Sequence, residues 1–397
     1  MSERKKYIFY ALILGFLTMI GPISIDTFLP MVPSIAKGLN VSIGSIEFSL
    51  TAIFTGNAIG QIIYGPVSDR FGRRPIILIA LFIFFIATIG AGLSTDIETL
   101  VFWRFLQGLM MASGRILANS VARDLYEREK LAKLITTIML VGIMSSIGSA
   151  PLGGFLSEYY SWHTIFWFMA IYSGIAFLIF FVLFKETIPE KDYRALKPSV
   201  LFENFSTIIT NHTFLLNVIC GGFILSGLVT YLNSSSGVLI GAFGIKPALY
   251  GLLYATVMVG YASAAITAGK LMNYFNAATL SKFGAFSIAL GGICMLVFAL
   301  TGLKHAGAIL APMIVFMVGF AFLYPQTISA GLMPFPEKAG TASSLQGFLQ
   351  NLMAAIFSAF LAIFADGTAI PMGFAMAICG ISAAATYMLF IRRIEHQ

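Results

Sequence analysis

The stretch "GPVSDRFGRRP", Gly65–Pro75, places Asp69, Arg70, Arg73 and Arg74 among glycines and prolines, between two long apolar segments. Charged residues make up only 10% of the 397 residues, whereas a soluble globular chain has roughly 25%. Glycine and proline permit a sharp turn. The stretch therefore predicts a short polar loop where one apolar helix ends and the next begins.

The segments on both sides of this loop are apolar enough to cross a membrane. The chain is 58% hydrophobic, and one crossing needs about 20 mostly apolar residues to span about 30 Å of hydrocarbon. We expect an all-α integral membrane protein with twelve transmembrane helices near residues 7–33, 44–68, 74–93, 97–123, 134–157, 163–184, 213–241, 248–272, 279–302, 306–333, 341–365 and 370–391. The first is expected to be retained and not cleaved as a signal peptide.

The longest polar interval, residues 185–212, divides these spans into six and six. Its prolines and mixed charges favour a cytoplasmic linker with at most a short surface helix. We therefore expect an N-terminal six-helix bundle over residues 1–184 and a C-terminal six-helix bundle over residues 213–397.

The two halves also resemble each other in sequence. Aligning "GNAIGQIIYGPVSDRFG" from Gly56 with "GYASAAITAGKLMNYFN" from Gly260 matches two glycines, Gly56 with Gly260 and Gly65 with Gly269, and places Asn273 opposite Asp69. A weak duplication of this kind is typical of transporters built from parallel repeats.

The distribution of positive charge predicts the orientation in the membrane. Of the 24 Lys and Arg residues, the expected outer loops hold only Lys37, Lys246 and Lys304. Cytoplasmic loops carry the excess of basic residues. We therefore expect a protein of the bacterial inner membrane with both termini in the cytoplasm. The net charge of +7 is explained by this asymmetry, and no nucleic-acid partner is expected.

Soluble-type catalysis has little support in this sequence. The three cysteines fall in expected spans without metal-ligand spacing, and there is neither a phosphate-binding glycine loop nor a nucleophile elbow. We expect no enzyme activity, no metal and no cofactor. The expected partners are a small-molecule substrate, protons and the lipid bilayer, and the chain is expected to act as a monomer.

Ionisable residues inside the spans are expensive to bury and are therefore candidates for function. Asp26 lies late in the first span and Arg104 early in the fourth. A rise of about 1.5 Å per residue places both roughly 10 to 12 Å below the outer boundary, which predicts an ion pair. Glu47, near the outer start of the second span, is the second candidate for a proton site.

Arg115 follows Arg104 by eleven residues, close to three helical turns, and returns to the same face as Gln107 and Met111. We expect this face to line a cationic, water-accessible cavity, with Arg115 about 16 Å deeper than Arg104. The alternative is that backbone carbonyls neutralise both arginines, which then only hold helices together.

Other polar and aromatic residues in the spans are candidates for solute contact. Any one of the polar ones is equally well explained by a hydrogen bond between helices. The predicted substrate-binding set is Phe28, Phe54, Asn57, Gln107, Met111, Arg115, Tyr231, Asn233, Tyr254, Gln346 and Gln350.

Three motifs together resemble the major facilitator superfamily. The opening loop is similar to its signature loop, "RFLQG" at Arg104–Gly108 to its fourth-span motif, and "GSAPLGG" at Gly148–Gly154 to the fifth-span motif of its antiporters. The resemblance implies two pseudo-symmetric six-helix bundles. It assigns the antiporter motif to Gly148, Pro151, Gly153 and Gly154.

A narrower resemblance covers nearly the whole chain. "SIDTFLPMVPSIA", "ARDLY" and "AGTASSLQGFLQ" are similar to stretches of the bicyclomycin/chloramphenicol resistance family of drug exporters. This resemblance implies proton-driven export of small amphipathic compounds by two rocking halves. Glu47, Asn119 and Arg115 depart from the family pattern and leave the substrate open.

These observations lead to a hypothesis for coupling. Burial disfavours a charged carboxyl and a nearby arginine favours it, so a change in the spacing of Asp26 and Arg104 would bind or release a proton. The alternatives are a transporter of a physiological metabolite, such as a siderophore or peptide, and a membrane sensor or enzyme that transports nothing.

The opening loop is also expected to act as a conformational latch. Asp69 would lie level with the start of the eleventh span near Gly340, where a helix N-terminus attracts a carboxylate. The predicted latch residues are Gly65, Asp69, Arg70, Gly72, Arg73 and, by resemblance, Arg123.

Overall fold

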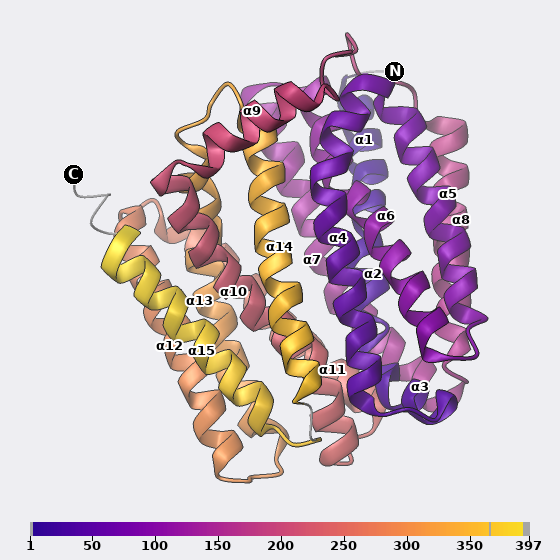
Figure 1. Cartoon of the computed structure of the whole chain (residues 1–397), viewed down its shortest axis with the longest axis vertical. Coiled ribbons are helices and arrows are strands. Elements are labelled where there is room, and N and C mark those ends of the chain that lie inside the picture. The colour runs from indigo at the N-terminus through magenta and orange to yellow at the C-terminus, as the bar shows by residue number, and fades with distance from the viewer. Residues whose placement is uncertain (1–2, 365–366, 392–397) are drawn as a thin grey trace.

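The computed structural model describes residues 3–364 and 367–391, with residues 198–201 described by their backbone alone. All regular structure in these ranges is helical (Figure 1). The helices up to the polar interval are α1 (Glu3–Thr18), α2 (Ile20–Asp26), η1 (Leu29–Met31), α3 (Val32–Leu39), α4 (Ile43–Phe71), α5 (Arg73–Gly92), α6 (Ile97–Leu125), α7 (Arg128–Tyr159) and α8 (His163–Leu183).

The remaining helices begin inside the predicted linker. They are α9 (Pro198–Ile209), α10 (His212–Ser236), η2 (Gly237–Ala242), α11 (Pro247–Leu271), α12 (Ala277–Leu300), α13 (Ala306–Leu332), α14 (Ala339–Ile363), α15 (Ile370–Thr386) and η3 (Tyr387–Ile391). Residue 365, the expected end of the eleventh span, and the expected tail 392–397 lie outside the described residues. The domain boundaries at 184 and 213 stay predictions.

Eleven helical segments in the described ranges are long and apolar enough to cross a membrane. The remaining long helix, α6, is as long as α4, with 29 residues. Its mean hydropathy is lower because it carries Arg104, Gln107 and Arg115. It packs between α4 and α5 inside the bundle. The expected twelve-helix architecture is confirmed.

The first span differs from the continuous helix expected over 7–33. It breaks after Asp26 and continues through η1 and α3 to Leu39. Proline lacks the N–H that a helix interior requires, and Pro30 and Pro33 stand at the starts of the two new helical segments. The break places the Asp26 carboxyl at the end of α2, inside the protein.

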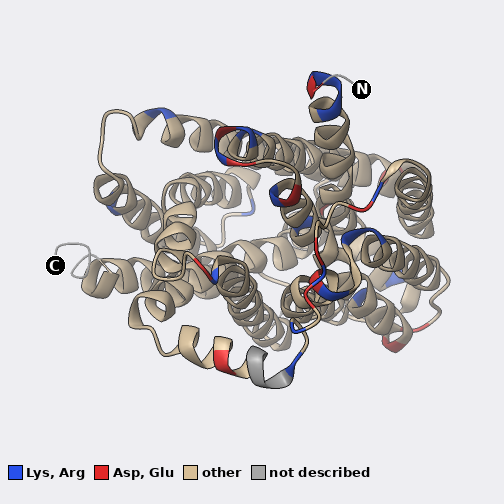
Figure 2. Ribbon diagram, turned by 90° about the horizontal axis from the view of Figure 1, so that it is seen from above, with Lys and Arg blue, Asp and Glu red and all other residues tan. Residues whose placement is uncertain are grey.

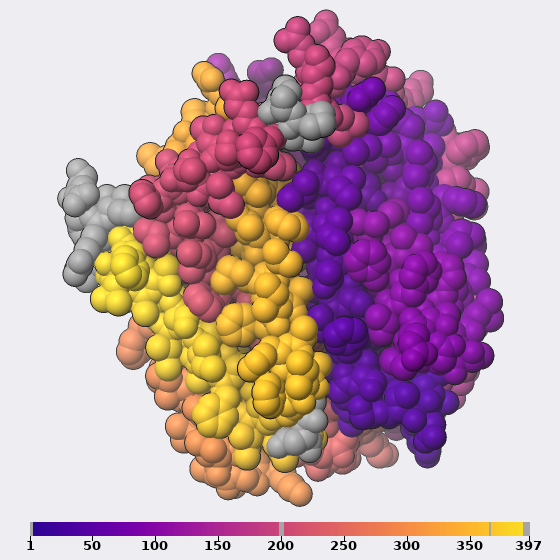
Figure 3. Space-filling view, in the orientation of Figure 1, coloured from indigo at the N-terminus to yellow at the C-terminus, as the bar shows by residue number. Residues whose placement is uncertain are grey.

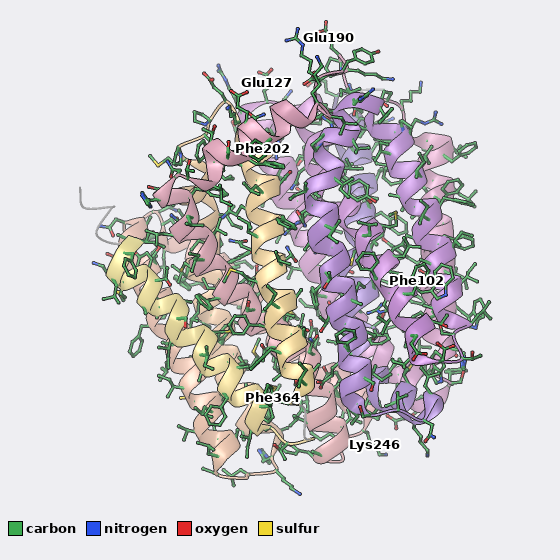
Figure 4. The ribbon with its side chains drawn as sticks, in the orientation of Figure 1. Phe102, Glu127, Glu190, Phe202, Lys246 and Phe364 are labelled. Atoms are coloured by element: carbon green, nitrogen blue, oxygen red, sulfur yellow. The ribbon has the colours of Figure 1, made fainter. Side chains whose placement is uncertain are left out.

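The ends of the helices define two faces of the molecule. Glu127 and Glu190 lie at the end that carries the N-terminus, here called the N-terminal face, and Lys246 and Phe364 lie at the other end, the opposite face (Figure 4). Seen from the N-terminal face, the coloured charged residues lie mainly in loops and at helix ends, whereas the helix bodies are tan (Figure 2).

The two halves of the chain meet along a seam formed by α4 and α14 (Figure 3). On the other side of the molecule α7 crosses α11 near the opposite face. A Cβ atom at Gly154 would overlap the carbonyl of Pro247, and one at Gly251 would overlap that of Ala150. Such glycines let two backbones approach closely. The halves are therefore joined at the opposite face.

Towards the N-terminal face α7 and α11 no longer touch at their glycines. Within the described residues, a Cβ atom at Gly142, Gly148 or Gly269 would meet nothing within 4 Å. The helices leave open space there, which belongs to the cavity or to the bilayer. The two halves are therefore in close contact at the opposite face, whereas α7 and α11 have open space beside their glycines towards the N-terminal face.

Candidate functional site

A cavity of about 750 Å³ lies between the two halves. Its wall runs from Pro22 and Ser146, deep in the bundle, to Asp69 and Lys338 at the helix ends of the N-terminal face. Helices of both halves line it, chiefly α4, α6, α7, α11, α13 and α14. Pockets for drug-sized ligands occupy about 300–1,000 Å³, so the volume suits a small organic solute.

Arg115 projects into this cavity from α6. Its side chain is exposed and lines the wall together with Asn119, one helical turn further on. Within the described residues, no carboxylate lies within ion-pair distance of it. Arg115 therefore contributes a positive charge to the cavity wall.

Asp26 lies just beyond the closed end of the cavity. Its side chain is only 4% exposed, and its Oδ1 accepts a hydrogen bond of 2.9 Å from the hydroxyl of Tyr254, on α11 of the other half. The hydroxyl of Ser146, which lines the cavity, also interacts with this carboxyl. The buried acid thus adjoins the cavity and contacts the second half of the protein.

The predicted ion pair between Asp26 and Arg104 is wrong for this conformation. Arg104 is fully buried, and its Nη1 donates to the Ser24 carbonyl at 3.1 Å and to Gln107 Oε1 at 3.1 Å. The guanidinium also lies 4.1 Å above the ring of Phe28. These contacts match the alternative expectation, in which the arginine holds helices together, and they fix the end of the broken first span.

Glu47 is also buried, with 3% of its surface exposed. It faces α10, where the Ser234 hydroxyl interacts with its carboxyl. One turn further along α4, Thr51 contacts Ser358 of α14, which also accepts a hydrogen bond from Asn233. Glu47 therefore belongs to the polar contact that closes the opposite face.

Of the predicted substrate-binding set, the structure brings only Arg115, Gln346 and Gln350 to the cavity wall. The others are packed into the closed contact or under neighbouring helices and lie outside this wall, so their assignment to a solute site stays a prediction. These are Phe28, Phe54, Asn57, Gln107, Met111, Tyr231, Asn233 and Tyr254.

The cavity also has walls that the sequence reasoning missed. Tyr261 and Met258 of α11, Tyr324 of α13 and Ser146 of α7 all line it. For α6, the sequence did carry a signal for a cavity wall beyond Arg115. Asn119 follows Arg115 by four residues and therefore lies on the same face of the helix. No charged residue stands beside Tyr261 or Tyr324 in the sequence, so α11 and α13 offered no comparable signal.

Asp69 and Arg73 form a charge cluster at the mouth of the cavity. The Arg73 guanidinium pairs with Asp69 at 2.5 Å and with Asp124 of α6 at 2.9 Å. Between the two helices, Gly72 has a φ of +107°, a left-handed conformation that favours glycine. The loop is therefore tied to the first half by its own arginine.

The predicted contact of Asp69 with the start of α14 is wrong for this conformation, because its carboxylate binds Arg73 instead. Other latch residues do approach that helix. The Arg123 guanidinium lies 3.8 Å from the position of a Cβ at Gly340, and Ser344 lies 3.4 Å from that of Gly65. Arg70 stacks on the ring of Phe71 at 5.4 Å.

The start of α5 binds a carboxylate that the sequence reasoning did not single out. Glu186, just after α8, accepts hydrogen bonds from the backbone N–H groups of Arg73 at 3.0 Å and Arg74 at 3.1 Å. Those of Thr187 and Ile188 also bind it. Partial burial alone would raise the pKa of Glu186, but these N–H groups hold it below its ordinary value.

The glycines of the predicted antiporter motif have different surroundings. A Cβ atom at Gly153 would overlap the backbone carbonyl of Thr27, and one at Gly154 would overlap that of Pro247. Pro151 lies against Gly251. Gly148 faces open space, so only part of the motif is needed for close packing here.

Two helical halves around a solute-sized cavity, with a buried acid at its closed end, define a multi-pass membrane protein of the transporter class. The family model of the Major Facilitator Superfamily matches residues 14–358. The chain belongs to this superfamily, as its three motifs led us to expect.

Curated relatives match over nearly their whole length. The chain is 28% identical to "Multidrug resistance protein D" of Escherichia coli over 400 residues, covering 100% of the chain and 99% of that protein. It is 27% identical to the "Bicyclomycin resistance protein homolog" of Haemophilus influenzae, with the same coverage. The expected resemblance to this drug-resistance group is confirmed.

Solved structures match in fold. A structure described as a D-xylose-proton symporter superposes with a TM-score of 0.78 at 17% identity, covering 96% of this chain and 98% of that one. A partially occluded, inward-open structure of the xylose transporter XylE of Escherichia coli gives 0.78 at 16% identity, covering 97% and 98%. At this identity the likeness concerns the fold alone.

Proposed function

We propose that the protein exports small amphipathic, drug-like compounds across a bacterial inner membrane in exchange for protons. Two relatives that match the full chain carry the names of drug-resistance proteins. The cavity volume and its mixed polar and apolar wall suit such solutes. No catalytic activity belongs to this proposal, and the protein acts as a monomer.

The observation that carries the proposal is the position of Asp26. A carboxyl buried in the membrane is expensive unless it has a role, and this one bonds to Tyr254 of the other half at the closed end of the cavity. Protonation changes the strength of that bond, because hydrogen bonds to charged groups are about twice as strong as neutral ones. Proton binding is thereby linked to the contact between the halves.

The proposed orientation places the N-terminal face in the cytoplasm, together with both termini and the linker. Most lysines and arginines of the loops lie at that face, as the positive-inside rule requires. The cavity then reaches the cytoplasm, and the contact of α7 with α11 closes the outside. A solute enters from the cytoplasm, and an outer proton neutralises Asp26 as the solute leaves.

Reconstituted protein tests this function. Proteoliposomes with an imposed pH gradient are screened against chemically diverse solutes, including drugs, peptides and siderophores. Movement of amphipathic compounds against their gradient, abolished by a protonophore, is the expected result. Transport of one peptide or siderophore alone would favour the metabolite alternative, and gradient-independent behaviour with every solute would overturn the proposal.

A further inference from the structure

The charged residues that line the cavity are unevenly distributed with depth. At the N-terminal face, charged lining residues stand at the end of α4, the start of α5, the end of α6 and just before α14. They are Asp69, Arg73, Arg123, Asp124, Glu337 and Lys338. Arg115 stands ten residues before the end of α6, which places it about 15 Å further in. Among the described lining residues, it is the only Asp, Glu, Lys or Arg at that depth.

The charges at the mouth largely neutralise one another. Arg73 binds both Asp69 and Asp124, and Glu337 is adjacent to Lys338 in the chain. Arg123 lies at the helix end, where solvent screens it. These groups leave the positive charge of Arg115 uncompensated.

An uncompensated guanidinium deep in a membrane cavity attracts anions strongly. The low-dielectric walls of the cavity focus its field. The planar fork of arginine matches the oxygens of carboxylates and similar oxyanions. A solute with one acidic group therefore gains an interaction here that a neutral or cationic analogue lacks.

Aromatic and apolar side chains from both halves line the cavity around this arginine. Tyr324 of α13 lies close enough to feel the Arg115 charge, and its hydroxyl donates to Gln350 Oε1 at 3.0 Å. Met139 and Ile143 of α7 and Met258 of α11 supply apolar surface. The cavity thus offers a cationic point beside a broad apolar wall.

We propose that Arg115 forms an anion-binding subsite and that the preferred substrates are organic monoanions with an apolar body. This inference rests on the proposed export function and adds the charge class of the solute. It carries an electrical consequence, because moving an anion outward is favoured by an inside-negative membrane potential. Export of a neutral analogue lacks that direct contribution.

Binding to purified protein in detergent tests the subsite without any proton gradient. The probes share one aromatic body: 2-naphthalenesulfonate, 2-naphthamide and 2-naphthyltrimethylammonium. We expect the sulfonate to bind about tenfold or more tightly than the amide, the gain typical of a hydrogen bond to a charged group. Arg115→Gln should remove this preference, and Arg115→Lys should retain part of it.

Lys130→Gln is the matched control. It removes one positive charge from the surface, where Lys130 pairs with Glu3, and it should leave the preference unchanged. Equal or tighter binding of the cation by the wild-type protein would overturn the proposal, as would an undiminished anion preference in Arg115→Gln. Thermal unfolding of each variant confirms that the fold is intact.

Transport separates this inference from the proposed function. In proteoliposomes, a potassium diffusion potential set with valinomycin should stimulate naphthalenesulfonate export more than naphthamide export, and Arg115→Gln should lose sulfonate export selectively. If the wild-type protein shows the anion preference in binding but no gradient-driven transport, the proposed function fails and the subsite stands. If it transports with a preference for cations, the subsite fails alone.

Discussion

Arg104 and Arg115 stand three turns apart on α6 but meet opposite surroundings. Arg104 is sealed among Ser24, Gln107 and Phe28, where partners satisfy part of its hydrogen-bonding capacity. Arg115 faces the cavity, where no described carboxylate pairs with it. The first therefore serves packing of the broken span, whereas the second is available to a solute.

Substitution of Glu186 tests how the start of the linker is attached to the first half of the protein. Its carboxylate binds the N–H groups at the start of α5, and the backbone N–H of Asp192 binds the Asp69 carbonyl at 3.0 Å. A carboxylate at a helix N-terminus contributes about 0.3–1 kcal/mol. We expect Glu186→Gln to lower the free energy of unfolding by about that amount at pH 7.

The pH dependence of this loss has a defined sign. The folded protein lowers the pKa of Glu186 from its ordinary value of 4.5, so the stabilisation is complete above pH 4.5 and disappears as the pH falls through the lowered value. Unfolding in detergent between pH 3.5 and 7 measures it. Glu190→Gln, in the same exposed linker, is the control, and a pH-independent gap for Glu186→Gln would contradict the assignment.

At the scale of elements, the crossing of α7 and α11 depends on glycines that touch backbone. Gly154 abuts Pro247, and Gly148, less than two turns earlier on α7, faces open space. Extra carbon in a packed contact costs about 1–3 kcal/mol, whereas alanine in an open helical position is slightly better than glycine. The two glycines of one motif should respond differently to the same change.

We predict that Gly154→Ala lowers the stability of the protein in detergent by about 1–3 kcal/mol and weakens closure at the opposite face. Gly148→Ala should leave stability unchanged or slightly higher. Thermal unfolding measures the first effect, and labelling of a cysteine placed at Ala248 measures closure. Equal behaviour of the two variants would contradict the crossing described here.

The helices were predictable from the sequence, because long apolar runs separated by short polar loops are visible in the local composition. The break after Asp26 was not, since the prolines mark a change of direction without specifying which carboxyl it buries. The pairing of Asp26 with Tyr254 in place of Arg104 depends on how the halves meet. That meeting joins residues 228 positions apart, which no local pattern encodes.

At the scale of the whole molecule, acids of the first half meet hydroxyls of the second where the protein is closed. Asp26 bonds to Tyr254, and Glu47 interacts with Ser234. The cavity begins next to the contact between Asp26 and Tyr254, on its side towards the N-terminal face. In the proposed mechanism, a proton that binds Asp26 would act on the closure and on the adjoining cavity together, as coupled exchange requires.

Gradient-driven transport by Asp26→Asn in proteoliposomes tests this coupling most directly. The asparagine keeps the size of the side chain but binds no proton, so pH-driven export should fall to the level of protein-free liposomes. Exchange of labelled for unlabelled solute without a gradient, and solute binding in detergent, should persist. Glu203→Gln, on the exposed surface of α9, is the control and should transport normally. Undiminished gradient-driven export by Asp26→Asn would contradict the account.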